Sequence, residues 1–330
     1  MTAFIDKARA NMKVFADKIR FEKWKAWIYL APALVLLAIF TFWPIFNTIK
    51  ISFLEGFSIA KSVRGVSFEF GFDNYLLALE DPDFLNCIKN TLLLCFLTVP
   101  ISTLLALVIA VSLNSIKWLQ KFLQTIFFLP YVTNSIAIGM VFAAMFNIMP
   151  LGTNYSPAVA ESMGVFNFLL DKMGLEPQIW INEGSTYAAN IFVMTVYIVW
   201  NALPFKILIL LGGLQSVNKQ YYDAAKVDGT SRVRVFTRIT VPLLSPMLAY
   251  VIITGFIGGF KEYSSIVGIF GEKMGPAHDS RRLNTMVGFI YDALEGNNQG
   301  RASAAALILF GIILVVTMIN LYVSKKKVHY

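Results

Sequence analysis

The residues whose types and spacing best suggest chemistry lie in or next to a polar segment, 217–241, between two apolar runs. They are Asp223, Ala224, Ala225, Asp228, Gly229 and Pro242. On a helix, Asp223 can accept a charge-assisted hydrogen bond from an arginine of another protein. The two alanines have small side chains, so a facing protein surface can approach the backbone closely. This pattern is typical of a docking surface.

Two short helices are expected to position these residues. Ser216 or Asn218 can cap a helix over 219–227, and Gly229 suits the left-handed position beyond its end. Thr230 or Ser231 can cap a second helix over 232–240, which we expect to stop before Pro242. The sequence therefore predicts a structured loop exposed to water.

Catalytic chemistry is not expected in this chain. His278 and His329 lie far apart in the sequence, and we predict no catalytic residues and no metal site. Cys87 and Cys95 would be about 12 Å apart along a helix, too far for a disulfide. The chain has no Gly-x-x-x-x-Gly-Lys-Ser/Thr motif for binding nucleotide phosphates. We therefore expect neither an enzyme nor a nucleotide cofactor in this chain.

The composition indicates a membrane protein. Hydrophobic residues make up 57% of the chain and charged residues 15%, whereas soluble domains have roughly 25% charged residues. A span needs about 20 apolar residues. Proline lies within or at the start of five of the apolar runs, so we expect interrupted helices around a cavity. We predict an all-α membrane protein with six transmembrane helices, over residues 27–49, 88–113, 123–146, 187–211, 243–268 and 302–322.

Basic residues set the expected orientation. They concentrate before the first run, in 217–241 and after the last run, which places both termini in the cytoplasm. The net charge of +8 then reflects topology and anionic lipid, and no nucleic acid partner is expected. We divide the chain into a basic amphipathic leader (1–25), a six-helix domain (26–325) and a cytoplasmic tail (326–330).

Several short motifs carry a resemblance to a known family. Asp223-Ala224-Ala225-x-x-x-Gly229, followed by Ile239-Thr240-Val241-Pro242, resembles the loop shared by membrane subunits of binding-protein-dependent ABC importers, with Asp223 and Val241 as conservative departures. The chain is most similar to the first permease of carbohydrate importers of the maltose/glycerol-phosphate kind. The supporting motifs are Phe72-Asp73-Asn74-Tyr75, Asp81-Pro82-Asp83-Phe84, Lys89-Asn90-Thr91-Leu92, Phe128-Leu129-Pro130-Tyr131, Val227-Asp228-Gly229 and Gly300-Arg301-Ala302-Ser303-Ala304.

The resemblance implies the type I permease fold and a multi-subunit importer in the plasma membrane of a prokaryote. This chain would pair with a second related permease and form half of the translocation pathway. Two copies of a cytosolic ATP-binding subunit would bind ATP and Mg²⁺ and receive the 217–241 loop. An extracytoplasmic binding protein would deliver a sugar or oligosaccharide.

The resemblance also places the sugar-contacting positions near polar and aromatic residues of the third to fifth runs. We predict a substrate path that includes Tyr131, Asn134, Trp200, Asn201, Phe205, Gly255, Gly259 and Glu262. An ionisable residue in an apolar run is a functional candidate by default, and Glu262 in the path would disfavour an anionic sugar. Alternatives stay open, because the glycine spacing also permits close helix packing and Tyr131 and Trp200 can be interfacial or packing residues.

Two other classes of membrane protein are compatible with the composition. An ion-coupled secondary carrier working without an ATPase would need more buried acids or histidines within the spans, and Glu262 is the clearest one. A membrane scaffold or protein-export subunit would not require the 223–229 pattern. Co-purification of an ATPase separates the importer from both.

Overall fold

Helices make up the secondary structure of the described part of the chain, apart from one isolated β-bridge between Leu54 and Phe70. The computed structural model describes residues 24–25, 27–116, 120–147 and 164–327. The predicted leader, except residues 24–25, and the last residues of the predicted tail lie outside these ranges. The helices are η1 (Ala38–Phe42), α2 (Trp43–Ser52), α3 (Ile59–Val63), α4 (Asp73–Leu79), α5 (Pro82–Ser115), α6 (Gln120–Val132), α7 (Ser135–Phe146), α9 (Val165–Lys172), α10 (Tyr187–Ser216), α11 (Lys219–Val227), α12 (Arg232–Val235), η2 (Phe236–Thr240), α13 (Val241–Leu243), α14 (Ser245–Gly259), α15 (Ser264–Phe270), α16 (Met286–Glu295) and α17 (Gln299–Lys327).

Four described helical segments are long and apolar enough to cross a membrane, namely Trp27–Ser52, α5, α10 and most of α17. Two bent pairs raise the number of candidate spans to as many as six. The first pair is Phe122–Val132 with Ser135–Phe146, bent by 99°, and the second is Arg232–Leu243 with Ser245–Gly259, bent by 68°. The prediction of a helical, multi-span protein is confirmed at this level.

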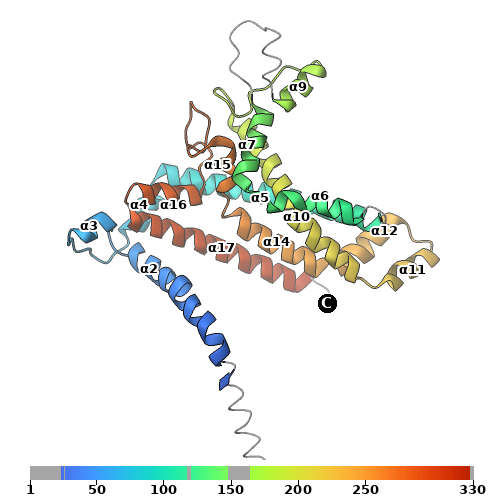
Figure 1. Cartoon of the computed structure of the whole chain (residues 1–330), viewed down its shortest axis with the longest axis horizontal. Helices are drawn as coiled ribbons and strands as arrows, with labels where there is room; N and C mark the ends of the chain where they lie inside the picture. Colours follow the sequence, from blue (N-terminus) through green and yellow to red (C-terminus); the bar gives the residue numbers. More distant parts are fainter. Residues whose placement is uncertain (1–23, 26, 117–119, 148–163, 328–330) are drawn as a thin grey trace, which may run out of the picture.

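Helices α5, α10, α14 and α17 pack against one another as the body of the molecule (Figure 1). Helices α11 and α12 lie at one end of this body, near the C-terminus, and α4 and α16 lie at the other (Figure 1). Apolar residues of α5, α10 and α14 fill one core, and residues of α5, α14, α16 and α17 fill another. Packing of these apolar faces therefore holds α5, α10, α14, α16 and α17 together.

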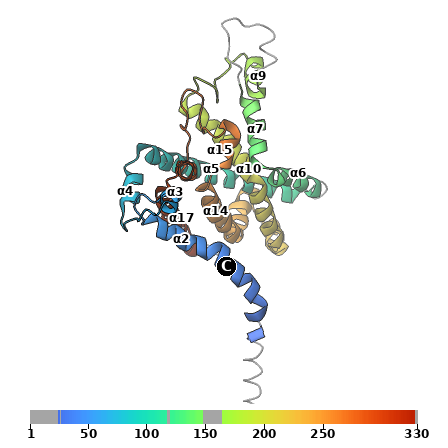
Figure 2. The ribbon, with the colours of Figure 1, turned by 60° about the vertical axis from the view of Figure 1, so that its left-hand side comes forward.

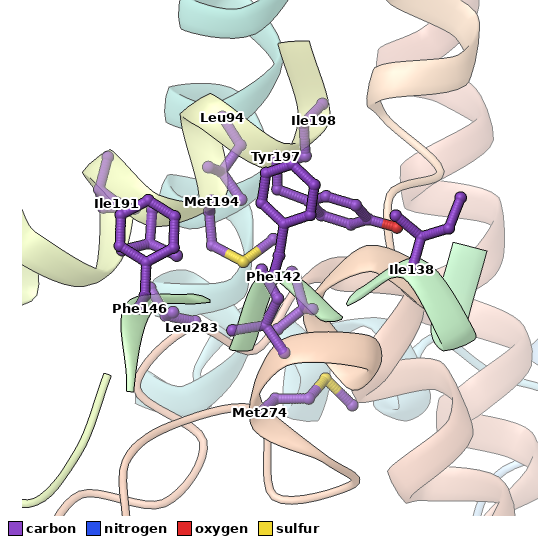
Figure 3. Close-up of a cluster of buried hydrophobic side chains, with 13 residues drawn as sticks. Leu94, Ile138, Phe142, Phe146, Ile191, Met194, Tyr197, Ile198, Met274 and Leu283 are labelled. Carbon is purple, nitrogen blue, oxygen red and sulfur yellow. The ribbon is translucent and has the colours of Figure 1, made fainter. Parts of the chain in front are cut away.

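A third core joins α7 and α15 to the ends of α5 and α10. Figure 3 shows Phe142 of α7 beside Tyr197 of α10, and their ring centroids are 4.9 Å apart. The Tyr197 hydroxyl donates to the backbone carbonyl of Ser135. A Cβ built on Gly139 of α7 would lie 2.6 Å from the Cα of Gly268 in α15. These two helices therefore approach closely because both have glycine at the crossing.

The fifth predicted span, 243–268, is wrong as one helix. Helix α14 ends at Gly259, and a separate helix, α15, begins at Ser264. A Glu262 carboxylate oxygen accepts from the Ser265 backbone N–H at 3.2 Å, which satisfies a free donor at the start of α15. Lys261 and Glu262, which lie between the end of α14 and the start of α15, interrupt the apolar run.

The predicted stop before Pro242 is also wrong. Helices α12, η2 and α13 form a continuous helical run that extends through Pro242 to Leu243. The segment just before this proline, η2, is π-helical. A proline ring clashes with the carbonyl one α-helical turn earlier, and the wider π turn accommodates it.

The first apolar segment extends away from the other helices (Figure 1, Figure 2). Its helix α2 packs on α17, but no residue of the apolar window of Trp27–Ser52 is buried. The exposed side chains include Trp27, Phe40 and Trp43. Lipid or another protein therefore has to cover most of this segment.

Candidate functional site

The predicted docking segment begins with the capped helix α11. Its limits, Lys219–Val227, match the predicted range 219–227, and the Asn218 side chain accepts from the Gln220 backbone N–H at 3.0 Å. Gly229 has φ +64°, the left-handed conformation predicted for it. The backbone N–H of Thr230 donates to the carbonyl of Ala225 at 3.0 Å and closes the helix end. The chain therefore leaves α11 in a sharp, fixed turn.

The exposed surface of α11 carries charges that are only weakly engaged within the chain. Asp223 lies 4.0 Å from the Lys219 ammonium and 3.9 Å from that of Lys226. All three side chains are largely exposed, and such surface ion pairs contribute little to stability. Asp223 thus stays available to an external cation.

The two alanines of the segment face different surroundings. Ala224 is exposed, whereas Ala225 is 5% exposed and is the buried residue of α11. Only Ala224 therefore offers the open approach that the sequence suggested for both. Asp228 is exposed at the end of the helix, and Pro242 lines a separate apolar groove with Asn320 and Ser324 of α17.

A second candidate site is a cavity of about 290 Å³ between α5, α6, α10 and α14. Six of the eight predicted path residues line it. Tyr131 comes from α6, Asn201 and Phe205 from α10, Gly255 and Gly259 from α14, and Glu262 from the break after α14. Residues from three separate predicted spans therefore meet around one hollow in the helix body.

The glycines of α14 bring it close to its neighbours at this cavity. A Cβ built on Gly259 would lie 2.8 Å from Cys95 Sγ, and one on Gly255 would lie 3.1 Å from a Val99 methyl carbon. Close packing, the alternative left open above, therefore applies to both residues. They also line the cavity, because a glycine leaves space where a side chain would fill it.

Aromatic side chains form part of the cavity wall. The rings of Tyr131 and Phe205 stack with centroids 5.8 Å apart and an interplanar angle of 20°. The Phe205 ring also lies 6.5 Å from that of Tyr250. The faces of such rings can contact the apolar face of a ligand.

Asn134 and Trp200 do not line this cavity. The Asn134 side chain accepts from the backbone N–H groups of Ile136 and Ala137, at 2.8 and 3.4 Å, and caps α7. The Trp200 ring packs beside that of Phe142 at 5.1 Å. Both residues have visible structural tasks, capping a helix and packing between helices.

Sequence reasoning missed the other charged residue of the cavity, Lys206. It is 4% exposed, and its ammonium donates to the Ser102 hydroxyl at 2.6 Å and the Thr103 hydroxyl at 3.0 Å. Thr98, Ser102 and Thr254 add hydroxyl groups to the lining. The signal was available, since Lys206 is the charged residue of the apolar run 187–211 and such a residue is a functional candidate.

A family model described as "Binding-protein-dependent transport system inner membrane component" matches residues 102–329, more than half of the chain. The chain belongs to this family. The predicted resemblance to a permease of a binding-protein-dependent ABC importer is confirmed. The match includes both the docking segment and most of the cavity lining, so the two candidate sites lie within the part that defines the family.

The permease is similar to several permeases of transport systems over nearly its whole length. It is 29% identical to the arabinooligosaccharides transport system permease protein AraP of Bacillus subtilis, covering 96% of this chain and 93% of that relative. It is 27% identical to the lactose transport system permease protein LacF of Rhizobium radiobacter, covering 95% of both. It is 28% identical to the sn-glycerol-3-phosphate transport system permease protein UgpA of Brucella suis, covering 95% and 99%.

Solved structures support the same fold. A chain of a bacterial ABC transporter involved in the import of the acidic polysaccharide alginate aligns with a TM-score of 0.72 at 23% identity, covering 94% of this chain and 98% of that one. The alginate transporter in complex with an alginate pentasaccharide-bound periplasmic protein aligns with a TM-score of 0.71 at 22% identity. The permease is therefore a multi-pass, helical membrane protein with the fold of ABC importer permeases.

Proposed function

We propose that this permease is the transmembrane subunit of an ATP-driven importer of sugars or oligosaccharides in the plasma membrane of a prokaryote. It forms half of the translocation pathway, and the 217–241 loop couples it to a cytosolic ATPase. ATP and Mg²⁺ are bound by two copies of that partner subunit. A sugar-binding protein delivers the substrate on the outer side.

The cavity is the observation that carries the transport half of this proposal. It combines stacked aromatic rings, Tyr131 and Phe205, with the amide of Asn201 and several hydroxyl groups. This mixture matches a sugar, which has an apolar ring face and hydroxyl groups at its edges. The names of the relatives, which transport arabinooligosaccharides and lactose, agree with it.

The docking segment supports the coupling half. Helix α11 follows α10 closely in the chain, because only Val217 and Asn218 separate their ends. A push on α11 is therefore transmitted to the helix that carries Asn201 and Phe205. Rigid movement of packed helices around a central site is a known means of alternating access.

The uncovered first segment supports a second permease as a partner. The apolar window of Trp27–Ser52 has no buried residue in the isolated chain, and its helix extends away from the body (Figure 2). A related permease in the same membrane would cover this surface without exposing it to water. The cytoplasmic placement of both termini follows from the basic residues and belongs to the same proposal.

Proteoliposomes test the proposal against the alternative, an ion-coupled carrier. The complex purified through a tag on this chain is reconstituted with the binding protein, and uptake of labelled oligosaccharides is measured. We expect uptake that requires ATP hydrolysis and persists when ionophores remove ion gradients. Uptake driven by an ion gradient in the absence of any ATPase would overturn the proposal.

A further inference from the structure

The buried cation in the cavity, Lys206, indicates which sugars fit there. Its ammonium donates to the Val99 carbonyl at 3.2 Å and to the Ser102 and Thr103 hydroxyls at 2.6 and 3.0 Å. All three acceptors are uncharged, and all belong to α5. Among the described residues, no carboxylate lies within 4.0 Å of this ammonium. The positive charge is therefore solvated by neutral dipoles but lacks a counter-ion.

The other charged residue of the cavity is differently engaged. A carboxylate oxygen of Glu262 accepts from the backbone N–H of Ser265 at the start of α15. Free N–H groups at a helix start stabilise a negative charge. Glu262 thus has a favourable partner in its own chain, whereas Lys206 does not have an anionic one. A charge held within a membrane protein is costly unless it is paired.

The groups around Lys206 are suited to an oxyanion. Asn201 lines the same cavity, and its amide, which makes only a 3.5 Å bond to the Ser135 hydroxyl, can donate to an oxyanion. The hydroxyls of Thr98, Ser102 and Thr254 also line the cavity, but each donates its proton to a backbone carbonyl of its own helix. A carboxylate can replace the Val99 carbonyl, the most distant of the three acceptors of the ammonium. The resulting charge-assisted bond is stronger than the neutral bond it replaces.

We propose that the cavity accepts sugars that carry an acidic group (a carboxylate, phosphate or sulfonate) and binds that group beside Lys206. The sugar ring then lies against the stacked Tyr131 and Phe205 rings. This inference rests on the proposed import function and narrows its substrate class. It differs from the expectation that Glu262 would disfavour an anionic sugar, because Lys206 also lines the cavity.

Uptake from a defined mixture tests this inference. Cells that depend on this importer receive uronate oligosaccharides, neutral oligosaccharides of matched length, a hexose phosphate and a sulfonated sugar. Mass spectrometry follows the loss of each probe from the medium, relative to cells lacking the permease. We expect depletion of at least one acidic probe, and the probe identifies which acidic group is carried. Absence of uptake of every acidic probe overturns the inference.

Substitutions in the cavity separate the charge of Lys206 from its structural role. We expect Lys206→Met to reduce acidic uptake by about tenfold or more, the cost of a lost charged hydrogen bond, and Lys206→Arg to retain most of it. Equal loss of acidic and neutral uptake in Lys206→Met would assign the lysine a structural role and overturn the inference.

The outcomes also distinguish this inference from the proposed function. Uptake of neutral sugars alone leaves the importer function intact and removes the acidic specificity. Uptake of neither class contradicts both. Recovery of the assembled complex by size-exclusion chromatography shows, for each variant, that the comparison is made on a folded permease.

Discussion

Neighbouring alanines in the docking segment have different environments, and this difference can be tested residue by residue. Ala225 is buried against its own chain, whereas Ala224 is exposed on the surface of α11. Sequence similarity alone treats the pair as one motif. The burial of each side chain depends on how α11 packs, which the local pattern does not specify.

Glutamate substitutions at these two positions should therefore impair different properties, the stability of the permease in one case and its coupling to ATP hydrolysis in the other. Ala225→Glu buries a charge without a partner. We therefore expect either no folded permease or a melting temperature that is lower by several degrees. Ala224→Glu should change stability by less than about 0.5 kcal/mol but reduce sugar-stimulated ATP hydrolysis of the complex. Melting temperature and ATPase rate are measured for both variants. Normal coupling in Ala224→Glu would remove this face of α11 from the docking surface.

The candidate path shows how far residue types alone could predict a site. Tyr131, Asn201 and Phe205 interrupt apolar runs with groups that bind sugars, lie near the positions that the family resemblance implies, and line the cavity. Asn134 and Trp200 satisfied the same criterion but cap a helix and pack on Phe142. The criterion cannot separate these cases, because it does not include where each side chain points.

At the scale of elements, sequence patterns predicted helices well and their interruptions poorly. The limits of α11 follow from Asn218 as a cap and Gly229 as a stop, both of which are local signals. The bend between α6 and α7 and the break between α14 and α15 lie inside runs that are apolar on both sides. Hydropathy does not distinguish one long helix from two short ones, since both bury the same residues.

The crossing of α7 and α15 provides a test at this scale. Gly139→Ala places a Cβ 2.6 Å from the Cα of Gly268, so the helices must separate, at a cost of about 1–3 kcal/mol. Gly311→Ala in α17 is the matched control, because a Cβ there meets nothing within 4 Å. We expect a lower melting temperature in detergent for Gly139→Ala alone, with faster hydrogen exchange in α7 and α15. Equal melting temperatures would show that this crossing is not tightly packed.

At the scale of the whole molecule, composition and charge predicted a multi-span membrane protein, and the fold and family agree. The partner subunits are harder to predict from the sequence, because the sequence of one chain does not contain those of its partners. Among the described residues, the exposed surfaces include the first apolar segment and one face of α11. One is suited to a second permease in the membrane and the other to a soluble subunit. Under the proposed function, the permease works only within a larger complex.

Site-specific photo-crosslinking in intact cells tests the central claim most directly. A photoreactive amino acid replaces Val227 in α11, which is 88% exposed, or Val63 in α3, which is 83% exposed. With a cytoplasmic N-terminus and a first span over 27–49, residue 63 lies on the outer side of the membrane. We expect the residue at 227 to crosslink to a cytosolic ATP-binding subunit, identified by mass spectrometry, and the residue at 63 not to do so. A residue at 227 that is reached by membrane-impermeant reagents from outside, or that crosslinks to no ATP-binding protein, would contradict the claim.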